Sequence, residues 1–163
     1  MPVFMEISPQ MCGSELQAKP KEKATGQERP GRILLVDDDR AAIEPLHIQL
    51  QIEGFEVLLT ETGQQGLDLA RSWHPDVIVL DLCLPDVHGL EICQALMTTS
   101  ATADIPIIIL SGMEGRDLPR RCRAAGGMYY VAKPYDPNVL LLLISQAAAD
   151  HRLWHDAGSQ NSE

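Results

Sequence analysis

The feature that most constrains the fold of this chain is an unbroken apolar run, Val77–Leu80, which ends in one carboxylate, Asp81. A run without polar alternation is typical of a strand that is buried on both faces, as in a parallel sheet covered by helices. Pro85 and Gly89 then turn the chain. Ligands of open α/β sheets bind beyond the carboxyl ends of the strands, so Asp81 is the first candidate functional residue.

Other short apolar segments also have the composition of strands, and segments with helical spacing of apolar residues separate them. We expect strands at 32–36, 55–60, 77–80, 107–110 and 128–132, and helices at 40–53, 62–73, 89–97, 114–125 and 136–154. Repetition of the βα unit predicts an α/β fold in which helices cover both faces of a parallel sheet, in three layers. Pro45 lies within the first helix, beyond the position that tolerates proline, so we expect a kink or a late start there.

The composition limits the environment and the partners. The 13 Lys and Arg residues against 23 Asp and Glu residues give a net charge of −10, which disfavours direct binding of nucleic acid and is compatible with an acidic cation site. The sequence has no signal-peptide pattern and no apolar span of about 20 residues, so we expect a cytoplasmic protein without membrane insertion. Four cysteines lack the spacing of metal ligands or of a disulfide framework and are expected to be free thiols: Cys12, Cys83, Cys93 and Cys122.

We expect one domain, at residues 31–154, between two segments without regular structure. Residues 1–30 are polar and rich in proline, with no sustained period, and are predicted to be a disordered leader. Residues 155–163 are predicted to be a flexible tail. The five histidines show no evident ligand spacing and are expected to be surface residues: His47, His74, His88, His151 and His155.

Reactive side chains gather where the predicted strands end. Asp37 and Asp38 follow the first strand, and Asp81, Ser111 and Lys133 follow the third, fourth and fifth. These ends share one edge of a parallel sheet, where clustered carboxylates would bind a hard cation such as Mg²⁺, which takes oxygen ligands. A carboxylate that attacks phosphorus needs such a metal, a cation such as lysine and a hydroxyl to hold the phosphoryl oxygens. The set therefore fits transfer of a phosphoryl group to a carboxylate.

Four motifs stand in order at these strand ends: Val36-Asp37-Asp38, Leu80-Asp81-x-x-x-Pro85-Asp86-x-x-Gly89, Ile109-Leu110-Ser111-Gly112 and Val131-Ala132-Lys133-Pro134. Together they make the chain, over about 32–153, resemble the receiver domain of response regulators. The resemblance implies a flavodoxin-like, doubly wound sheet of five parallel strands in the order 2-1-3-4-5. It also implies two-component phosphorelay signalling, in which a sensor histidine kinase or a histidine phosphotransfer protein supplies the phosphoryl group.

The resemblance assigns roles around a magnesium ion. Asp81 would be the phosphoacceptor. Asp38 and Asp81 would bind Mg²⁺ directly, Asp37 would act mainly through water, and the backbone carbonyl of Cys83 would be a further ligand.

The resemblance also assigns the parts of a switch. Ser111 would be the switch hydroxyl that is drawn toward the phosphoryl group. Lys133 would pair with the phosphoryl oxygens, and its bond to Pro134 is expected to be cis. Tyr130 would be the aromatic side chain that turns inward on activation.

Two departures from the family pattern lead to further expectations. Cys83 and Met113 occupy the two positions that, by the resemblance, would lie beside the path of an attacking water. Their side chains would position water poorly, so we expect a long-lived phosphoryl-aspartate. The last helix is apolar on every side over Val139–Ile144. Three of these positions are usually polar in the family, which predicts an exposed docking patch for a partner or a second copy unless the leader or tail covers it: Val139, Leu142 and Leu143.

The expected function is a phosphorylation-controlled switch without an output domain, which acts through partner proteins. It would not be an enzyme, except that it assists its own phosphorylation and dephosphorylation. A relay that passes the phosphoryl group between histidines fits equally well, and a receiver fold that binds partners without phosphorylation is an alternative. A haloacid-dehalogenase-type phosphatase is disfavoured: Asp37-Asp38-Asp39 supplies its D-x-D pattern, but Arg40-Ala41 does not continue it and no cap segment is evident.

Overall fold

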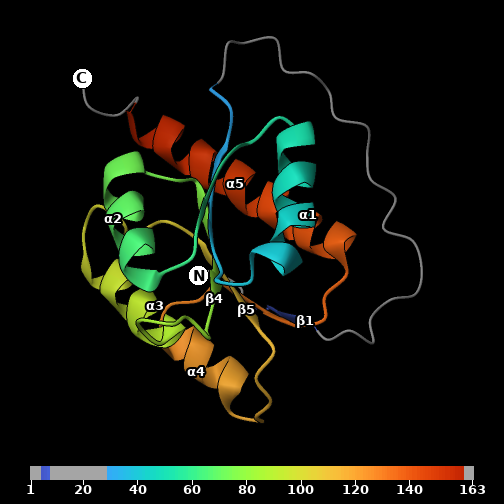
Figure 1. The fold of residues 1–163 in the computed structure, drawn as a ribbon. Coiled ribbons are helices and arrows are strands. Elements are labelled where there is room, and N and C mark those ends of the chain that lie inside the picture. Colours follow the sequence, from blue (N-terminus) through green and yellow to red (C-terminus); the bar gives the residue numbers. More distant parts are fainter. Residues whose placement is uncertain (1–4, 8–28, 160–163) are drawn as a thin grey trace.

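The computed structural model describes residues 5–7 and 29–159, which form a sheet of six parallel strands between two layers of helices (Figure 1). The strands are β1 (Met5–Ile7), β2 (Arg32–Val36), β3 (Glu56–Thr60), β4 (Val77–Asp81), β5 (Ile107–Ser111) and β6 (Tyr129–Ala132), in the order β1-β6-β5-β4-β2-β3. The helices are α1 (Arg40–Ile52), α2 (Gly63–Trp73), α3 (Gly89–Thr98), α4 (Leu118–Ala124) and α5 (Pro137–Ser159). The predicted doubly wound sheet with the order 2-1-3-4-5 is confirmed for β2 to β6.

Alternate residues of the central strands build an apolar core on each face of the sheet. In β2, Leu34 and Val36 pack toward α2, α3 and α4, whereas Ile33 and Leu35 pack toward α1 and α5. The strands β4 and β5 are buried along their whole length. Because water is excluded from both faces, these strands lack the polar alternation of a sheet with one open face. The core on both faces thus packs around the strands whose carboxyl ends meet at one edge of the sheet.

The prediction of a disordered leader over residues 1–30 is wrong for Met5–Ile7. These residues form β1, which pairs in parallel with β6 in the register Met5↔Tyr129 and Ile7↔Val131. Without β1, the outer side of β6 would present unpaired backbone N–H and C=O groups, and such an edge accepts any extended segment of suitable length. The sheet therefore has one strand more than expected.

The helices differ from the prediction at three places. The last helix, α5, continues to Ser159, so residues 155–159 are helical and do not belong to a flexible tail. The fourth helix begins at Leu118, four residues later than predicted, with a proline in its first turn. Pro45 causes no late start, because α1 runs from Arg40 to Ile52 with Pro45 inside it, on the exposed side.

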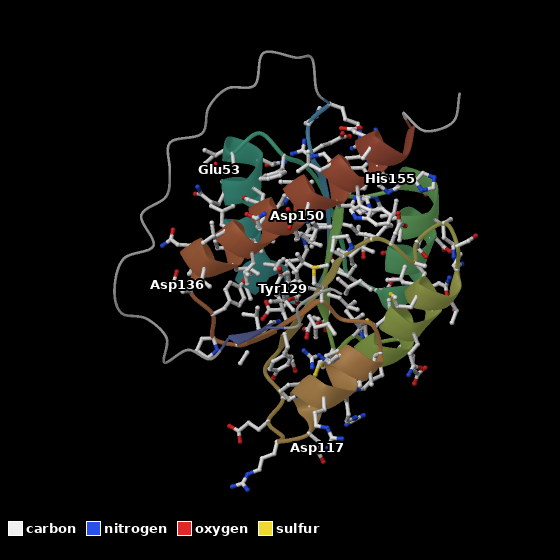
Figure 2. The ribbon with its side chains drawn as sticks, turned by 180° about the vertical axis from the view of Figure 1, so that it is seen from behind. Glu53, Asp117, Tyr129, Asp136, Asp150 and His155 are labelled. Atoms are coloured by element: carbon white, nitrogen blue, oxygen red, sulfur yellow. The ribbon has the colours of Figure 1, made fainter. Side chains whose placement is uncertain are left out.

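The predicted apolar patch on α5 is only partly exposed. Leu142 is 45% exposed, whereas Val139 and Leu143 are half-buried and Leu143 packs against the core. Figure 2 shows α5 running from Asp136 at its beginning to His155 near its end. Asp136 accepts a hydrogen bond from the backbone N–H of Asn138 at 2.8 Å, which explains where the helix starts.

Further expectations concern cysteines and membranes. Cys83, Cys93 and Cys122 are free thiols, as predicted, and Cys12 lies outside the described residues. Burial raises the pKa of Cys93 to about 12 and that of Cys122 to about 11, so neither thiol is reactive.

Among the residues that the structure describes, no helix combines the length and apolar character needed to cross a membrane.

Candidate functional site

Three carboxylates meet at the carboxyl edge of the sheet. Since β2 pairs with β4 in the register Val36↔Leu80, the residues that follow these strands lie side by side. Oxygens of Asp37, Asp38 and Asp81 lie within 4.8 Å of one another. Asp37 and Asp81 are buried, whereas Asp38 is exposed and faces solvent. The three residues predicted to surround a cation are thus brought together.

Lys133 reaches this cluster from the loop after β6. Its Nζ lies 2.8 Å from Oδ2 of Asp37 and 3.1 Å from Oδ2 of Asp81. The peptide bond between Lys133 and Pro134 is cis, as expected. Burial alone would lower the pKa of Lys133, but the hydrogen bond to Asp37 and the charges of Asp81 and Asp37 outweigh it and raise the pKa. The lysine is therefore charged at neutral pH and fixed between the two buried carboxylates.

The electrostatics of the cluster favour a further cation. Burial raises the pKa of Asp37 although the hydrogen bond from Lys133 acts in the opposite direction. Three carboxylates, those of Asp37, Asp38 and Asp81, also lie together here, whereas Lys133 brings one ammonium group to two of them. Oxygen ligands at this spacing fit Mg²⁺, which is commonly bound by one or two carboxylates and retained waters. The donor set of Asp37, Asp38 and Asp81 therefore fits the ion that the sequence predicts.

The loop after β4 is shaped by backbone contacts around Asp81. The backbone N–H of Cys83 donates to Oδ1 of Asp81 at 3.2 Å, and Oδ2 is left facing Lys133. A Cβ atom on Gly89 would lie 2.6 Å from the backbone oxygen of Asp81, so only glycine fits there. Asp86 accepts hydrogen bonds from the backbone N–H groups of Gly63 and Gln64 at 2.8 and 3.0 Å. Asp86 thus anchors the start of α2 to this loop and is separate from the metal-ligand set.

Ser111 and Tyr130 are linked through the backbone of one residue. The hydroxyl of Ser111, at the end of β5, accepts a hydrogen bond from the backbone N–H of Met113 at 3.0 Å. The hydroxyl of Tyr130 donates to the carbonyl of Met113 at 3.5 Å. Both side chains are buried, so Tyr130 points inward in this structure. The predicted switch residues therefore lie in one connected unit beside the carboxylates.

The prediction that the histidines are surface residues holds for His155, which is exposed, and is wrong for His151, whose side chain is largely enclosed. The prediction that the histidines show no ligand spacing overlooked this pair. These residues are four apart on α5, so their rings share one face of the helix. The ring centroids are 4.6 Å apart, and the ring of His151 is 9% exposed. The i, i+4 spacing was visible in the sequence, but the nearby acidic residues, Asp76 and Asp104, come from other parts of the chain.

Comparison with known families and proteins identifies similar proteins over most of the domain. Residues 33–145 match the family described as the response regulator receiver domain. The cell cycle transcriptional regulator CtrA of Caulobacter vibrioides is 35% identical over 113 residues, which are 69% of this chain and 48% of CtrA. The cell cycle response regulator CtrA of Brucella ovis is 36% identical over 113 residues. The chain spans about half the length of these relatives, at 48%.

Solved structures of similar fold cover a comparable part of the chain. A CheY-like response regulator receiver domain protein from Methanospirillum hungatei has a TM-score of 0.70 and 27% identity, covering 76% of this chain and 97% of that chain. A putative response regulator from Chloroflexus aurantiacus has a TM-score of 0.69 and 28% identity, covering 74% of this chain and 98% of that chain. The family match begins at residue 33 and therefore does not include β1 (Met5–Ile7).

Proposed function

This chain belongs to the response regulator receiver domain family of two-component signalling, and we propose that Asp81 is its phosphoacceptor. The observation that carries the proposal is the position of Lys133. Its Nζ lies 3.1 Å from Oδ2 of Asp81, at the end of β4, and 2.8 Å from Oδ2 of Asp37, just after β2. A phosphoryl group on Asp81 would meet this ammonium group without rearrangement of the strands. Such preorganised charge is the main means by which proteins assist phosphoryl transfer.

The proposed donor is a phosphohistidine of a sensor kinase or a phosphotransfer protein. A carboxylate oxygen of Asp81 would attack phosphorus, the P–O bond would form as the P–N bond breaks, and the histidine would leave with the electron pair of that bond. Asp37, Asp38, Asp81 and the carbonyl of Cys83 would hold Mg²⁺, which would neutralise charge on the transferred phosphoryl oxygens. Lys133 would bind the same oxygens from the side of β6.

Phosphorylation would be transmitted through Met113. The hydroxyl of Ser111 accepts from the backbone N–H of Met113 at 3.0 Å, so a turn of this side chain toward a phosphoryl oxygen would lengthen or break that bond. The carbonyl of Met113 accepts from Tyr130, so a shift of this residue would change the packing of that ring. An intramolecular hydrogen bond contributes about 0.5–1.5 kcal/mol, which is enough to bias two nearby conformations. A downstream protein would then bind the changed surface around β6 and α4.

Intact mass spectrometry after incubation with Mg²⁺ and acetyl phosphate tests the proposal. We expect the wild type to gain one phosphoryl group and Asp81→Asn to gain none. Asp39→Asn is the matched control, because Asp39 is an exposed carboxylate in the same loop that caps α1 and lies outside the proposed metal-ligand set. It should be phosphorylated like the wild type.

Two results would contradict the proposal. Phosphorylation of Asp81→Asn would place the acceptor elsewhere. A wild type that binds Mg²⁺ but gains no phosphoryl group would indicate a receiver fold that binds its partners without phosphorylation.

A further inference from the structure

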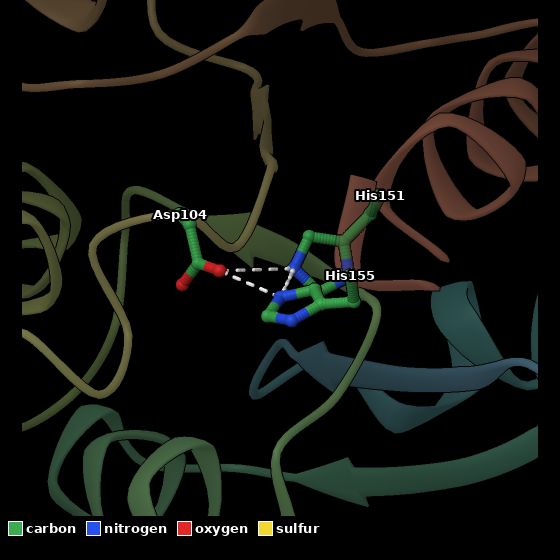
Figure 3. A group of neighbouring side chains, drawn as sticks. All are labelled: Asp104, His151 and His155. Carbon is green, nitrogen blue, oxygen red and sulfur yellow. Dashed lines mark hydrogen bonds and ion pairs between the residues drawn. The ribbon is translucent and has the colours of Figure 1, made fainter. Parts of the chain in front are cut away.

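A second cluster of metal-ligating side chains lies at the opposite edge of the sheet, where the strands begin. Asp104 lies between α3 and β5, and His151 and His155 lie one turn apart on α5 (Figure 3). Oδ2 of Asp104 is 2.6 Å from Nε2 of His155 and 3.7 Å from Nε2 of His151. The two Nε2 atoms are 3.2 Å apart. One carboxylate oxygen and two imidazole nitrogens thus converge on one point.

The spacing of these three atoms fits a single ion. In a triangle with sides of 2.6, 3.2 and 3.7 Å, each corner lies about 1.9 Å from the centre. An ion slightly above that plane would be about 2.0–2.2 Å from all three atoms, the distance that zinc takes to imidazole nitrogen and carboxylate oxygen. Imidazole with carboxylate suits zinc and its neighbours, whereas Mg²⁺ and Ca²⁺ take oxygen ligands.

His151 is held in the orientation that a metal ligand needs. Its Nδ1 lies 3.4 Å from Oδ1 of Asp76, a buried carboxylate that also accepts two hydrogen bonds from Arg29 and one from the backbone N–H of Arg32. Burial alone would raise the pKa of Asp76, but the hydrogen bonds from His151 and Arg29 outweigh it and lower the pKa, so Asp76 is charged. A carboxylate that accepts the Nδ1 proton leaves the electron pair of Nε2 for a metal, as in carboxylate–histidine–zinc triads.

The surroundings leave room for a fourth ligand. A cavity of about 280 Å³ adjoins the cluster and is lined by Asp104, His151, His155 and also by His74, the residue that ends α2. Three protein ligands would leave one tetrahedral position open toward this cavity. Asp81 lies at the other end of the five-residue β4, roughly 16 Å away along the strand, so the two sites do not overlap.

We propose that Asp104, His151 and His155 bind one divalent transition-metal ion of the zinc type. The ion would link the last turns of α5, through His151 and His155, to Asp104 in the segment before β5. The competing explanation is a hydrogen-bonded ion pair between Asp104 and a protonated His155, with no metal. The proposal does not depend on phosphorylation of Asp81, and Asp81→Asn should bind the metal like the wild type.

Zinc titration of the metal-free full chain tests the proposal. Excess Mg²⁺ is kept in the buffer to occupy the carboxylates at the other edge. By calorimetry, and by elemental analysis after gel filtration, we expect one zinc ion per chain. Removal of a ligand by His155→Ala or Asp104→Asn should weaken zinc binding at least tenfold, as loss of even an indirect partner does. His47→Ala, which removes a histidine of α1 outside the cluster, should bind zinc like the wild type.

A spectroscopic probe identifies the ligands independently. Co²⁺ in place of zinc should give the intense visible absorption of a tetrahedral site in the wild type and not in His155→Ala. The side chain of His155 is 59% exposed, so its removal should leave the far-UV circular dichroism unchanged. Failure of the wild type to retain zinc at micromolar concentration would refute the proposal and leave the ion pair. Equal zinc affinity of the wild type and His155→Ala, as expected if Cys83 or Asp38 were the ligand, would refute it as well.

Discussion

The substitution Asp76→Asn removes one charge at the point where several segments of the domain meet. The side chain of Asp76 is 1% exposed and accepts hydrogen bonds from Arg29 at 2.8 and 2.9 Å, from the backbone of Arg32 at 2.8 Å and from His151 at 3.4 Å. Asparagine has nearly the same shape but presents an N–H₂ group to donors on at least one side. The change therefore tests the polar contacts with little change in packing.

The size of the effect follows from the exposure of the partners. Removing one member of a buried ion pair costs about 3–5 kcal/mol. The side chain of Arg29 is 51% exposed, so water screens its ion pair with Asp76. That ion pair alone contributes less than about 1 kcal/mol to the free energy of unfolding. His151 and the backbone N–H of Arg32 are better enclosed and lose a charged acceptor, at about 1.5–3 kcal/mol for each such bond. Asparagine keeps one acceptor oxygen, so we expect the low end of the sum. The free energy of unfolding should fall by about 3 kcal/mol, with a decrease in Tm of about 6–12 °C.

The pH dependence gives a second check on the same group. The hydrogen bonds hold the pKa of Asp76 below its ordinary value of 3.8 in spite of burial. Its carboxylate therefore stabilises the fold fully above that pH, and the contribution is lost as the pH falls toward the lower pKa of the folded state. The difference in stability between the wild type and Asp76→Asn should shrink as the pH falls below about 4.

Urea denaturation at neutral pH, followed by far-UV circular dichroism, measures the effect, and Arg29→Gln is the control. We expect Arg29→Gln to lower the free energy of unfolding by less than about 1 kcal/mol, because that side chain is half exposed. A loss below about 0.5 kcal/mol for Asp76→Asn would refute the argument, since changes of that size are typical of surface sites. Equal losses for the two variants would assign the whole effect to Arg29.

Other perturbations give separate checks. Gly89→Ala places a Cβ 2.6 Å from the backbone oxygen of Asp81, so we expect it to cost about 1–3 kcal/mol in urea denaturation and to slow phosphorylation by acetyl phosphate. Mg²⁺ should raise the Tm of the wild type but not of Asp38→Asn in a thermal melt, because a ligand that binds only the folded state stabilises it. The phosphoryl group should persist for minutes or longer, and Met113→Asn should shorten its lifetime in a phosphate-release assay; release from the wild type within seconds would contradict this.

The strands and the phosphoacceptor candidates could be predicted because both depend on local pattern. Strands such as Ile107–Ser111 exclude water from both faces, so their sequences carry no polar residue before the end. In a parallel sheet all these ends face one edge, and this places Asp37, Asp81 and Lys133 together once the strand order is known. The site therefore follows from topology and from the positions of a few polar residues.

Contacts between distant segments could not be predicted in this way. The strand β1 has only three residues, and its pairing is decided by the open edge of β6. The hydrogen bond from Met113 to Ser111 depends on the conformation of a loop that has no marked sequence pattern. Asp104 approaches His155 only because α5 crosses the sheet to its opposite edge, where the helix continues beyond the predicted end.

The pairing of β1 with β6 means that the cooperative unit of this domain is wider than the segment shared with its relatives. A chimera that transplants only residues 33–145 would leave behind β1, Arg29 and the last turns of α5. Its β6 would become an open edge, free to pair with the same strand of another molecule and to seed aggregation. Domain exchange with other regulators should therefore use junctions outside residues 5–159, and a fusion partner placed before Met5 would lie beside the strand that leads to Lys133.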